Sequence, residues 1–393
     1  MKGTSRQAVV GYGFILPWLV ALVVFIGYPF LAGFYFSFCD FPPLKSPLFI
    51  GMDNYMELLG DTGFHRSLGV TFIFAAFAIP IGVFLALTLA MFLNARVRGQ
   101  SFYRVIFYIP HLVPTVVVAI LWLWIFNPTY GLLNIVLKGV FLAADAWTGL
   151  FFSLGAAAKG TGCVRPAAAA LLAAPVLAWG AFLSRAGQAM AKRRPARASL
   201  VRFLAAVALV LALVPALNAG LTVLAPADMQ KLHSPGWLSD SSSFPAELPI
   251  APSWALWGII VMSMWGVGQM AVIYLAKLQD VPMELYEAAD IDGANWWGKA
   301  RHITLPMISP VILFNVVMAI IGTFQVFAEP YIMTQGGPED KTRFVAMFVY
   351  DQAFQYQRVG YASAVAWVLF LIIVALTILA FKVINKHVYY AGR

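Results

Sequence analysis

The sequence predicts an all-α protein that crosses a membrane several times. Of its 393 residues, 61% are hydrophobic and 11% are charged, whereas about 25% of the residues of an average soluble domain are charged. Long apolar runs recur along the chain, and a helix needs about 20 such residues to cross the hydrocarbon core of a bilayer. The net charge of +9 comes from basic residues beside these runs, so it orients helices and does not indicate a nucleic-acid-binding protein.

Eight stretches are long and apolar enough to be membrane-spanning helices. They cover residues 11–37, 68–94, 104–126, 166–184, 202–225, 253–276, 307–329 and 360–384. Their apolarity is continuous, which distinguishes them from the short alternating strands of a membrane β-barrel. The first stretch follows Lys2 and Arg6 and is longer than the core of a signal peptide, so we predict an uncleaved first span.

The distribution of basic residues predicts that both termini are cytoplasmic. With the N-terminus inside, most of the 26 Lys and Arg residues fall in the N-terminal segment, the inner loops and the C-terminal tail. The apolar stretch 135–158 is interrupted by Lys138 and Asp145, and it either lies at the outer interface or crosses as a ninth span. We favour the interface, because an extra crossing would invert every later loop and remove the charge bias.

The sequence lacks the patterns that common enzymes and metal sites require. Two cysteines, Cys39 and Cys163, are too few for a disulfide framework, and the five histidines stand apart from one another. Residues Gly293 to Ala300 approach a phosphate-binding loop, but the pattern ends in Ala where Ser or Thr is needed and it follows a helix. We therefore expect no catalytic residue, metal site or cofactor on this chain.

Residues 279–306, between the sixth and seventh apolar runs, are predicted to contain a short helix. Asp280 and Pro282 suit its first turn, and Gly293 ends it with a positive φ. One narrow face of this helix is small and partly apolar, and it consists of Leu285, Ala288, Ala289 and Asp292. From spacing alone, an ordinary surface helix between two spans is the favoured interpretation.

The same loop resembles the EAA loop of binding-protein-dependent ABC permeases. The sequence Glu-Ala-Ala is followed after three residues by a glycine, and after nine more by Ile-x-Leu-Pro. The resemblance implies that the loop is a coupling helix that docks into a cytoplasmic ATPase subunit. The ATPase-coupling residues that it predicts are Glu287, Ala288, Ala289, Asp292, Gly293, Ile303, Leu305 and Pro306.

Other segments resemble the carbohydrate-uptake branch of these permeases, which includes transporters of maltose, lactose and glycerol phosphate. They are residues 49–55, 104–114, 126–131, 265–268 and 336–338. The resemblance implies a polytopic inner-membrane helical bundle with a MetI-like core of six helices. Residues 1–137 would supply its N-terminal part, with spans one to three, and residues 235–393 its C-terminal part.

Residues 138–234 fall outside the resemblance and are predicted to be an insertion. They contain most of the interfacial stretch and an apolar hairpin of two spans, 166–184 and 202–225, around a basic inner loop. The hairpin is either a docking surface for a partner or for anionic membrane lipid, or a peripheral insertion outside the transport pathway. We favour the peripheral insertion.

The resemblance also implies partners and a place in the cell. The chain would be a transport subunit, not an enzyme, in a bacterial inner membrane, and it would import a sugar or sugar-like solute. It would work with a second permease subunit, an extracytoplasmic solute-binding protein and two cytoplasmic ATPase subunits, and the ATPase subunits would bind ATP and Mg. The sequence does not identify the solute, nor does it say whether the second permease is an identical copy.

Two other functions remain as alternatives. An ion-coupled secondary transporter would need acidic relays within the membrane, and the interiors of these spans lack Asp and Glu. A membrane-embedded transferase would need a catalytic acid or a metal cluster at a membrane interface.

Polar residues within spans are candidate pathway residues, because they are costly in lipid and usually face a cavity or the bundle interior. Amide and hydroxyl groups with neighbouring aromatic rings suit a sugar. The tentative substrate-pathway residues are Trp265, Gln269, Tyr274, Asn315, Phe324 and Gln325. For each polar member, a hydrogen bond between helices is an equally good explanation.

Overall fold

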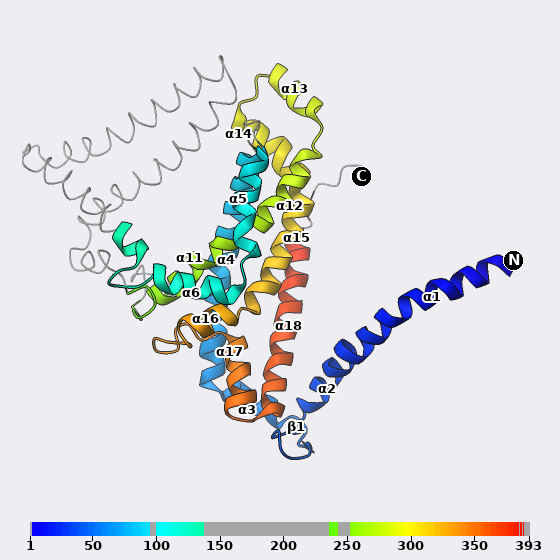
Figure 1. Cartoon of the computed structure of the whole chain (residues 1–393), viewed down its shortest axis with the longest axis vertical. Coiled ribbons are helices and arrows are strands. Elements are labelled where there is room, and N and C mark those ends of the chain that lie inside the picture. The colour runs from blue at the N-terminus through cyan, green and yellow to red at the C-terminus, as the bar shows by residue number, and fades with distance from the viewer. Residues whose placement is uncertain are drawn as a thin grey trace, which may run out of the picture.

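The computed structural model is an elongated bundle of helices with one long arm (Figure 1). It describes residues 2–94, 100–136, 236–242, 252–384, 386 and 388, and for residues 2–11 and 100 the backbone alone. The predicted spans 166–184 and 202–225, and the interfacial stretch beyond residue 136, therefore lie outside the described residues.

The first part of the chain forms helices and a short antiparallel hairpin, in which Cys39 pairs with Phe49. In chain order, the elements are α1 (Lys2–Leu22), the π-helix η1 (Val23–Gly27), α2 (Tyr28–Phe36), β1 (Cys39–Asp40), β2 (Leu48–Phe49), α3 (Asp53–Gly60), α4 (Thr62–Asn94), α5 (Gln100–Leu112) and α6 (Thr115–Ile125).

The regular elements of the described C-terminal part are all helices. In chain order, its elements are α11 (Trp254–Ser263), the 3₁₀-helix η2 (Met264–Gly266), α12 (Gly268–Gln279), α13 (Met283–Ile291), α14 (Trp296–Lys299), the π-helix η3 (Ala300–Thr304), α15 (Leu305–Phe324), α16 (Ala328–Met333), α17 (Val345–Tyr350), the π-helix η4 (Asp351–Gln355) and α18 (Val359–Ile384).

Within the described residues, four helical stretches are long and apolar enough to cross a membrane. They are Tyr12–Phe36, Thr62–Asn94, Trp296–Met333 and Val359–Ile384, and they contain the first, second, seventh and eighth predicted runs almost completely. Two bent helix pairs bring the number to six if each pair is one span. These six stretches match the six predicted runs that fall on described residues.

The expectation of one helix across residues 104–126 is wrong. Helices α5 and α6 meet at an angle of 97°. Pro114 lacks a backbone N–H and disfavours the helical conformation at Val113, so the helix cannot continue through this point. The backbone instead turns at Pro114, whose ψ of 137° lies outside the helical region.

The predicted sixth and seventh runs also differ from single helices. The run 253–276 is bent by 42° between α11 and α12, where Gly266 and Gly268 flank the break. The run 307–329 is helical only to Phe324, and Gln325 stands at the C-cap with φ of −103° and ψ of 7°. Gln269 and Tyr274 therefore lie on α12, Asn315 lies on α15, and Gln325 stands at the end of α15.

Helix α15 contains Pro310, and a hydroxyl compensates for the N–H that this proline lacks. The carbonyl of Pro306 would normally accept a hydrogen bond from the N–H of residue 310. The Ser309 hydroxyl donates to that carbonyl at 2.6 Å. Such side-chain donors let a proline stand in a membrane helix without leaving a carbonyl unpaired in lipid.

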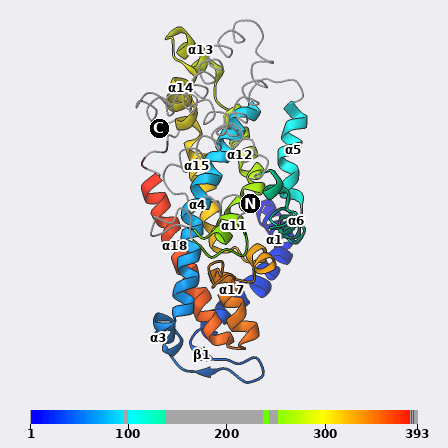
Figure 2. The same ribbon diagram turned by 90° about the vertical axis from the view of Figure 1, so that its left-hand side faces the viewer.

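Helix α4 runs along the bundle and packs on helices from the C-terminal part (Figure 2). Near its start, Phe64 joins Phe324, Phe348 and Tyr361 in one buried cluster. Near its end, the small residues of α4 face α12 in a second cluster. The buried residues of this second cluster, here called the inner cluster, are Ala86, Ala90, Leu93, Ala271, Tyr274, Leu275, Leu278, Val281 and Ile308.

A close approach between α5 and α12 depends on Gly268. A Cβ atom at this position would overlap the carbonyl oxygen of Phe107 on α5. The two backbones can therefore meet only because residue 268 has no side chain, as is common where membrane helices cross.

The first span, residues 12–36, extends away from the bundle as an arm (Figure 1). None of its membrane-length window is buried. At its outer end, rings of Phe30 and Phe34 pack on Trp367 of α18 with centroids 4.7 Å apart. The arm thus contacts the rest of the described chain mainly through this end.

Asn54 fixes the connection between the arm and the bundle. Its buried Nδ2 donates to the carbonyls of Ser37 and Cys39 at 2.9 and 3.0 Å. The Tyr55 hydroxyl donates to Ser37 Oγ at 2.8 Å. The motif at residues 49–55 therefore has a structural role, because its side chains hold the chain in place where it leaves the first span.

We predict that Gly268→Ala lowers the thermal stability of the purified protein, because the added methyl group must push α5 and α12 apart. Overpacking of this kind costs about 1–3 kcal/mol. Thermal unfolding in detergent measures the effect. Gly266→Ala is the matched control, since a Cβ at residue 266 meets no atom within 4 Å. Equal melting temperatures for the two variants would contradict the close approach.

Candidate coupling loop and translocation site

Helix α13 lies beyond the end of the bundle, in continuation of α12 and α14 (Figure 1). All of its nine residues are described, and none of them is buried. Apolar side chains are exposed here: Leu285 is 42% exposed and Ile291 is 89% exposed. Much of the surface of α13 is therefore left uncovered by the described part of the chain.

The end of α13 is fixed by a glycine-dependent cap. Gly293 has φ of +75°. The N–H of Ala294 donates to the carbonyl of Ala289 at 2.8 Å, and that of Gly293 to Asp290 at 3.1 Å. This pair of bonds is a Schellman motif, and its left-handed residue is usually glycine. Gly293 thus ends the helix, as the sequence predicts.

The predicted coupling residues fall into two groups in the structure. Glu287, Ala288, Asp292 and Gly293 are exposed, and Ala289 is half-buried. A second group stands at the base of α15 and is half-buried: Ile303, Leu305 and Pro306. The first group lies on the exposed surface at the end of α13, and the second lies at the start of a membrane helix.

Tyr274 and Asn315 are the two predicted pathway residues that the structure brings together. Both are buried, at 0% and 1% exposed, on α12 and α15. Asn315 is the polar neighbour of the Tyr274 hydroxyl. Within the described chain, neither that hydroxyl nor Asn315 Nδ2 makes a hydrogen bond of ordinary distance and angle. Buried polar atoms without partners are costly, which marks this pair as a candidate solute contact.

The other four pathway candidates lie elsewhere. Trp265 and Gln269 are exposed near the bend of α11 and α12, and Trp265 meets Trp122 edge-on at 5.9 Å. Phe324 is buried against Phe72 at 5.1 Å. Gln325 is exposed at the end of α15. The six candidates therefore do not form one cluster.

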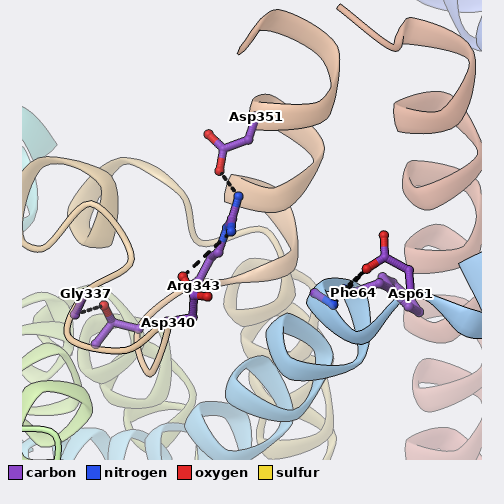
Figure 3. A network of polar contacts seen from close by, with 8 residues as sticks. Asp61, Phe64, Gly337, Asp340, Arg343 and Asp351 are labelled. Atoms are coloured by element: carbon purple, nitrogen blue, oxygen red, sulfur yellow. Dashed lines mark hydrogen bonds and ion pairs between the residues drawn. The ribbon is translucent and has the colours of Figure 1, made fainter. Parts of the chain in front are cut away.

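Sequence reasoning missed a set of ion pairs at the opposite end of the bundle, near the β1–β2 hairpin. Arg343 lies between Asp340 and Asp351 (Figure 3), and its distance to Asp351 is 2.5 Å. Although burial alone would lower the pKa of Arg343, the hydrogen bond and charge of Asp351 raise it. Arg358 pairs with Glu57 in the same region but is more exposed.

Asp61 fixes the start of α4 at this same end. It accepts hydrogen bonds from the N–H groups of Phe64, at 3.2 Å (Figure 3), and Gly63, at 2.7 Å. It also accepts one from the Tyr361 hydroxyl at 2.7 Å. Partial burial raises the pKa of Asp61, but these bonds and the nearby Arg358 outweigh it and lower the pKa. The charged carboxylate therefore caps α4 and ties it to α18.

Comparison with known proteins decides the family. Residues 78–389 match the family described as "Binding-protein-dependent transport system inner membrane component". The chain belongs to this family. It is therefore a transport component of the inner membrane and not an enzyme, as the sequence predicts, and the all-α permease fold is confirmed.

Relatives of this permease cover almost its whole length. It is 28% identical to the "Probable ABC transporter permease protein YesP" of Bacillus subtilis, over 100% of this chain and 96% of the relative. It is 26% identical to the "Trehalose/maltose transport system permease protein MalF" of Thermococcus litoralis, over 96% and 94%. A third relative matches a shorter part of the chain. The "Lactose transport system permease protein LacF" of Rhizobium radiobacter is 37% identical over 37% of this chain and 47% of the relative.

A solved structure has the same fold as this permease. It is described as a "bacterial ABC transporter involved in the import of the acidic polysaccharide alginate". The TM-score is 0.60 and the identity 18%, over 98% of each chain. A second structure of an alginate ABC transporter, in complex with an "alginate pentasaccharide-bound periplasmic protein", gives a TM-score of 0.59 at 17% identity, over 97% of this chain and 95% of the other.

For this permease, Arg343→Gln is predicted to destabilise the fold more than Arg358→Gln. Loss of Arg343 leaves the mostly buried Asp351 carboxylate unpaired, which costs about 3 kcal/mol. The Arg358 pair is more exposed, so its loss costs at most about 1 kcal/mol. Unfolding of both variants in the same detergent measures the difference. A larger loss for Arg358→Gln would contradict the assignment.

Proposed function

We propose that this chain is one permease subunit of an ATP-driven importer that takes up a carbohydrate delivered by an extracytoplasmic binding protein. The printed names of its relatives include maltose, trehalose, starch degradation products and lactose as transported solutes. The single observation that most supports the coupling role is the exposed EAA face on α13, beyond the end of the bundle.

The α13 end of the bundle is the cytoplasmic end in this proposal. Lys277, Lys299 and Arg301 lie on or beside the helices at this end, as the positive-inside rule requires. Helix α18 starts at the hairpin end and runs to the α13 end (Figure 1), so the C-terminus is cytoplasmic. The hairpin end with Asp61 and Arg343 then faces the binding protein.

The complex that we propose contains a second permease subunit and two ATPase subunits. The second permease covers the arm, whose apolar side chains have little contact with the rest of the described chain. One ATPase subunit docks on the exposed group Glu287, Ala288, Asp292 and Gly293. ATP and Mg bind to the ATPase subunits, and this chain binds neither.

Coupling is tested by Ala288→Arg, which places a long charged side chain on the exposed face of α13. An unpaired charge inside a packed interface is costly, so the ATPase subunits are expected to be lost on purification. Co-purification from membranes with equal amounts of permease measures docking.

Leu44→Arg is the control for this substitution, since Leu44 is 92% exposed and lies in the hairpin loop at the opposite end. The control should retain the ATPase subunits. If Ala288→Arg also retains them and transports normally, α13 is not the docking helix.

The pathway is tested by Asn315→Leu. If Asn315 were only a packing residue, removal of its unpaired amide would leave stability and uptake unchanged or improved. If Asn315 instead contacts the solute, the Asn315→Leu variant should lose most uptake while its melting temperature stays equal or rises. Uptake of radiolabelled maltose and trehalose into cells measures this, with Gln325→Leu as a second variant expected to impair uptake.

Met318→Leu is the matched control for Asn315→Leu, because Met318 lies one turn further along α15 and is 50% exposed. Its uptake should equal that of the unmodified chain. Normal uptake by both Asn315→Leu and Gln325→Leu would remove these amides from the pathway.

A further inference from the structure

A hydrogen bond joins the coupling helix to the translocation helix. The Tyr286 hydroxyl on α13 lies 3.0 Å from Thr304 Oγ1, the last residue before α15. Thr304 is buried, at 6% exposed. The Tyr286 ring packs with Ile303 and Met307 against the inner cluster. Tyr286 is thus the residue of α13 whose side chain reaches into the bundle.

The faces of α13 have different tasks. Residues four apart share a face, so Tyr286 and Asp290 point the same way. Asp290 pairs with Lys299 at the base of α15, which shows that this face is turned toward the bundle. Ala288 and Asp292 lie on the other side and are exposed. One face is therefore free for a partner while the opposite face holds α15.

The direction of the hydrogen bond follows from the number of protons. Thr304 Oγ1 donates its one proton to the carbonyl of Lys299 at 3.3 Å. The Tyr286 hydroxyl must therefore donate to Thr304. The Lys299 carbonyl lies just before the π-helix η3, so the chain of bonds runs from α13 through Thr304 into the turn that begins α15. π-Helical turns often occur at functional sites.

The ion pair between Asp290 and Lys299 is the weaker of the two links. The Asp290 side chain is 67% exposed. Exposed ion pairs are weak, since water and salt screen them. The hydroxyl pair is part-buried, with Thr304 6% exposed, so it is screened less, and Tyr286 also packs against the inner cluster. Movement of α13 should therefore pass to α15 chiefly through Tyr286 and Thr304.

We propose that Tyr286 and Thr304 are positioning residues that transmit ATP-driven movement of α13 to the membrane helix α15. The inference rests on the proposed docking of an ATPase subunit on α13. Without the hydrogen bond, the ATPase would still dock and hydrolyse ATP, but the spans would respond less.

The test uses the complete complex in liposomes, with ATP and vanadate as the trapping ligands. A reporter cysteine replaces Ser263, beside the bend of α11 and α12, in a chain whose two native cysteines are changed to serine. The rate of maleimide labelling with and without trapping measures the response of the spans. ATPase co-purification and hydrolysis are measured on the same samples.

Tyr286→Phe and Thr304→Val are expected to reduce the trapping-dependent change in labelling about two- to ten-fold, the range of one net hydrogen bond. Both should retain normal ATPase recovery. Thr304→Ser keeps the hydroxyl and should restore the response. The double variant should be no worse than Thr304→Val, because both substitutions remove the same bond. Met318→Leu, an exposed change on α15 away from this bond, is the control and should behave as the unmodified chain.

The outcomes separate this inference from the proposed function. The proposed function fails, and the inference with it, if no ATPase subunit co-purifies with the unmodified chain. It fails also if the rate of maleimide labelling of that chain is the same with and without ATP and vanadate. If the unmodified chain responds and Tyr286→Phe and Thr304→Val respond equally, the inference alone is wrong. Loss of ATPase recovery in Thr304→Val would also overturn it, because Thr304 would then support docking instead of transmission.

Discussion

Backbone hydrogen bonding in an apolar surround is the constraint on which this structure depends. In lipid, each N–H and C=O group without a partner costs several kcal/mol, so a helix can break only where other groups replace the lost bonds. Ser309 supplies such a bond beside Pro310, and Asn54 supplies two to the end of the first span. At these two irregular points a polar side chain therefore supplies hydrogen bonds to the backbone.

The surfaces that remain apolar and exposed have a common explanation. The arm and α13 both stand away from the bundle, one along the membrane helices and one beyond their ends (Figure 1). A subunit of a larger transporter has no need to cover these surfaces itself. Helix α4 and the C-terminal helices form the packed body, and in the proposed complex the outlying elements contact other chains.

Apolar length predicted the spans well and their geometry poorly. Residues 68–94 and 360–384 became α4 and α18 because a continuous apolar run has few other stable forms in a bilayer. Hydropathy holds no information on direction, so the bend of 97° at Pro114 was missed although the proline itself was visible. Gly293 was predicted to take a positive φ because one residue type dominates that cap.

Pairings between distant residues could not be predicted in the same way. Tyr286 and Thr304 are 18 residues apart, and their contact depends on the cap at Gly293 and on the π-turn that follows. Of the polar pathway candidates, Tyr274 and Asn315 meet because α12 and α15 turn these faces toward each other. Composition identifies a polar residue in a span, but only packing decides whether it faces a neighbour.

If the second permease covers the arm as proposed, the anchor at Asn54 also affects how accurately the two subunits fit together. The stretch Tyr12–Phe36 has 25 residues, which at about 1.5 Å per residue makes a lever about 37 Å long. A rotation of about 5° at its fixed end would displace the far tip by roughly 3 Å, close to the spacing of packed side chains. In the proposed complex, the hydrogen bonds of Asn54 therefore help to set the alignment of the arm across the bilayer, and a small error at one membrane surface becomes a misfit at the other.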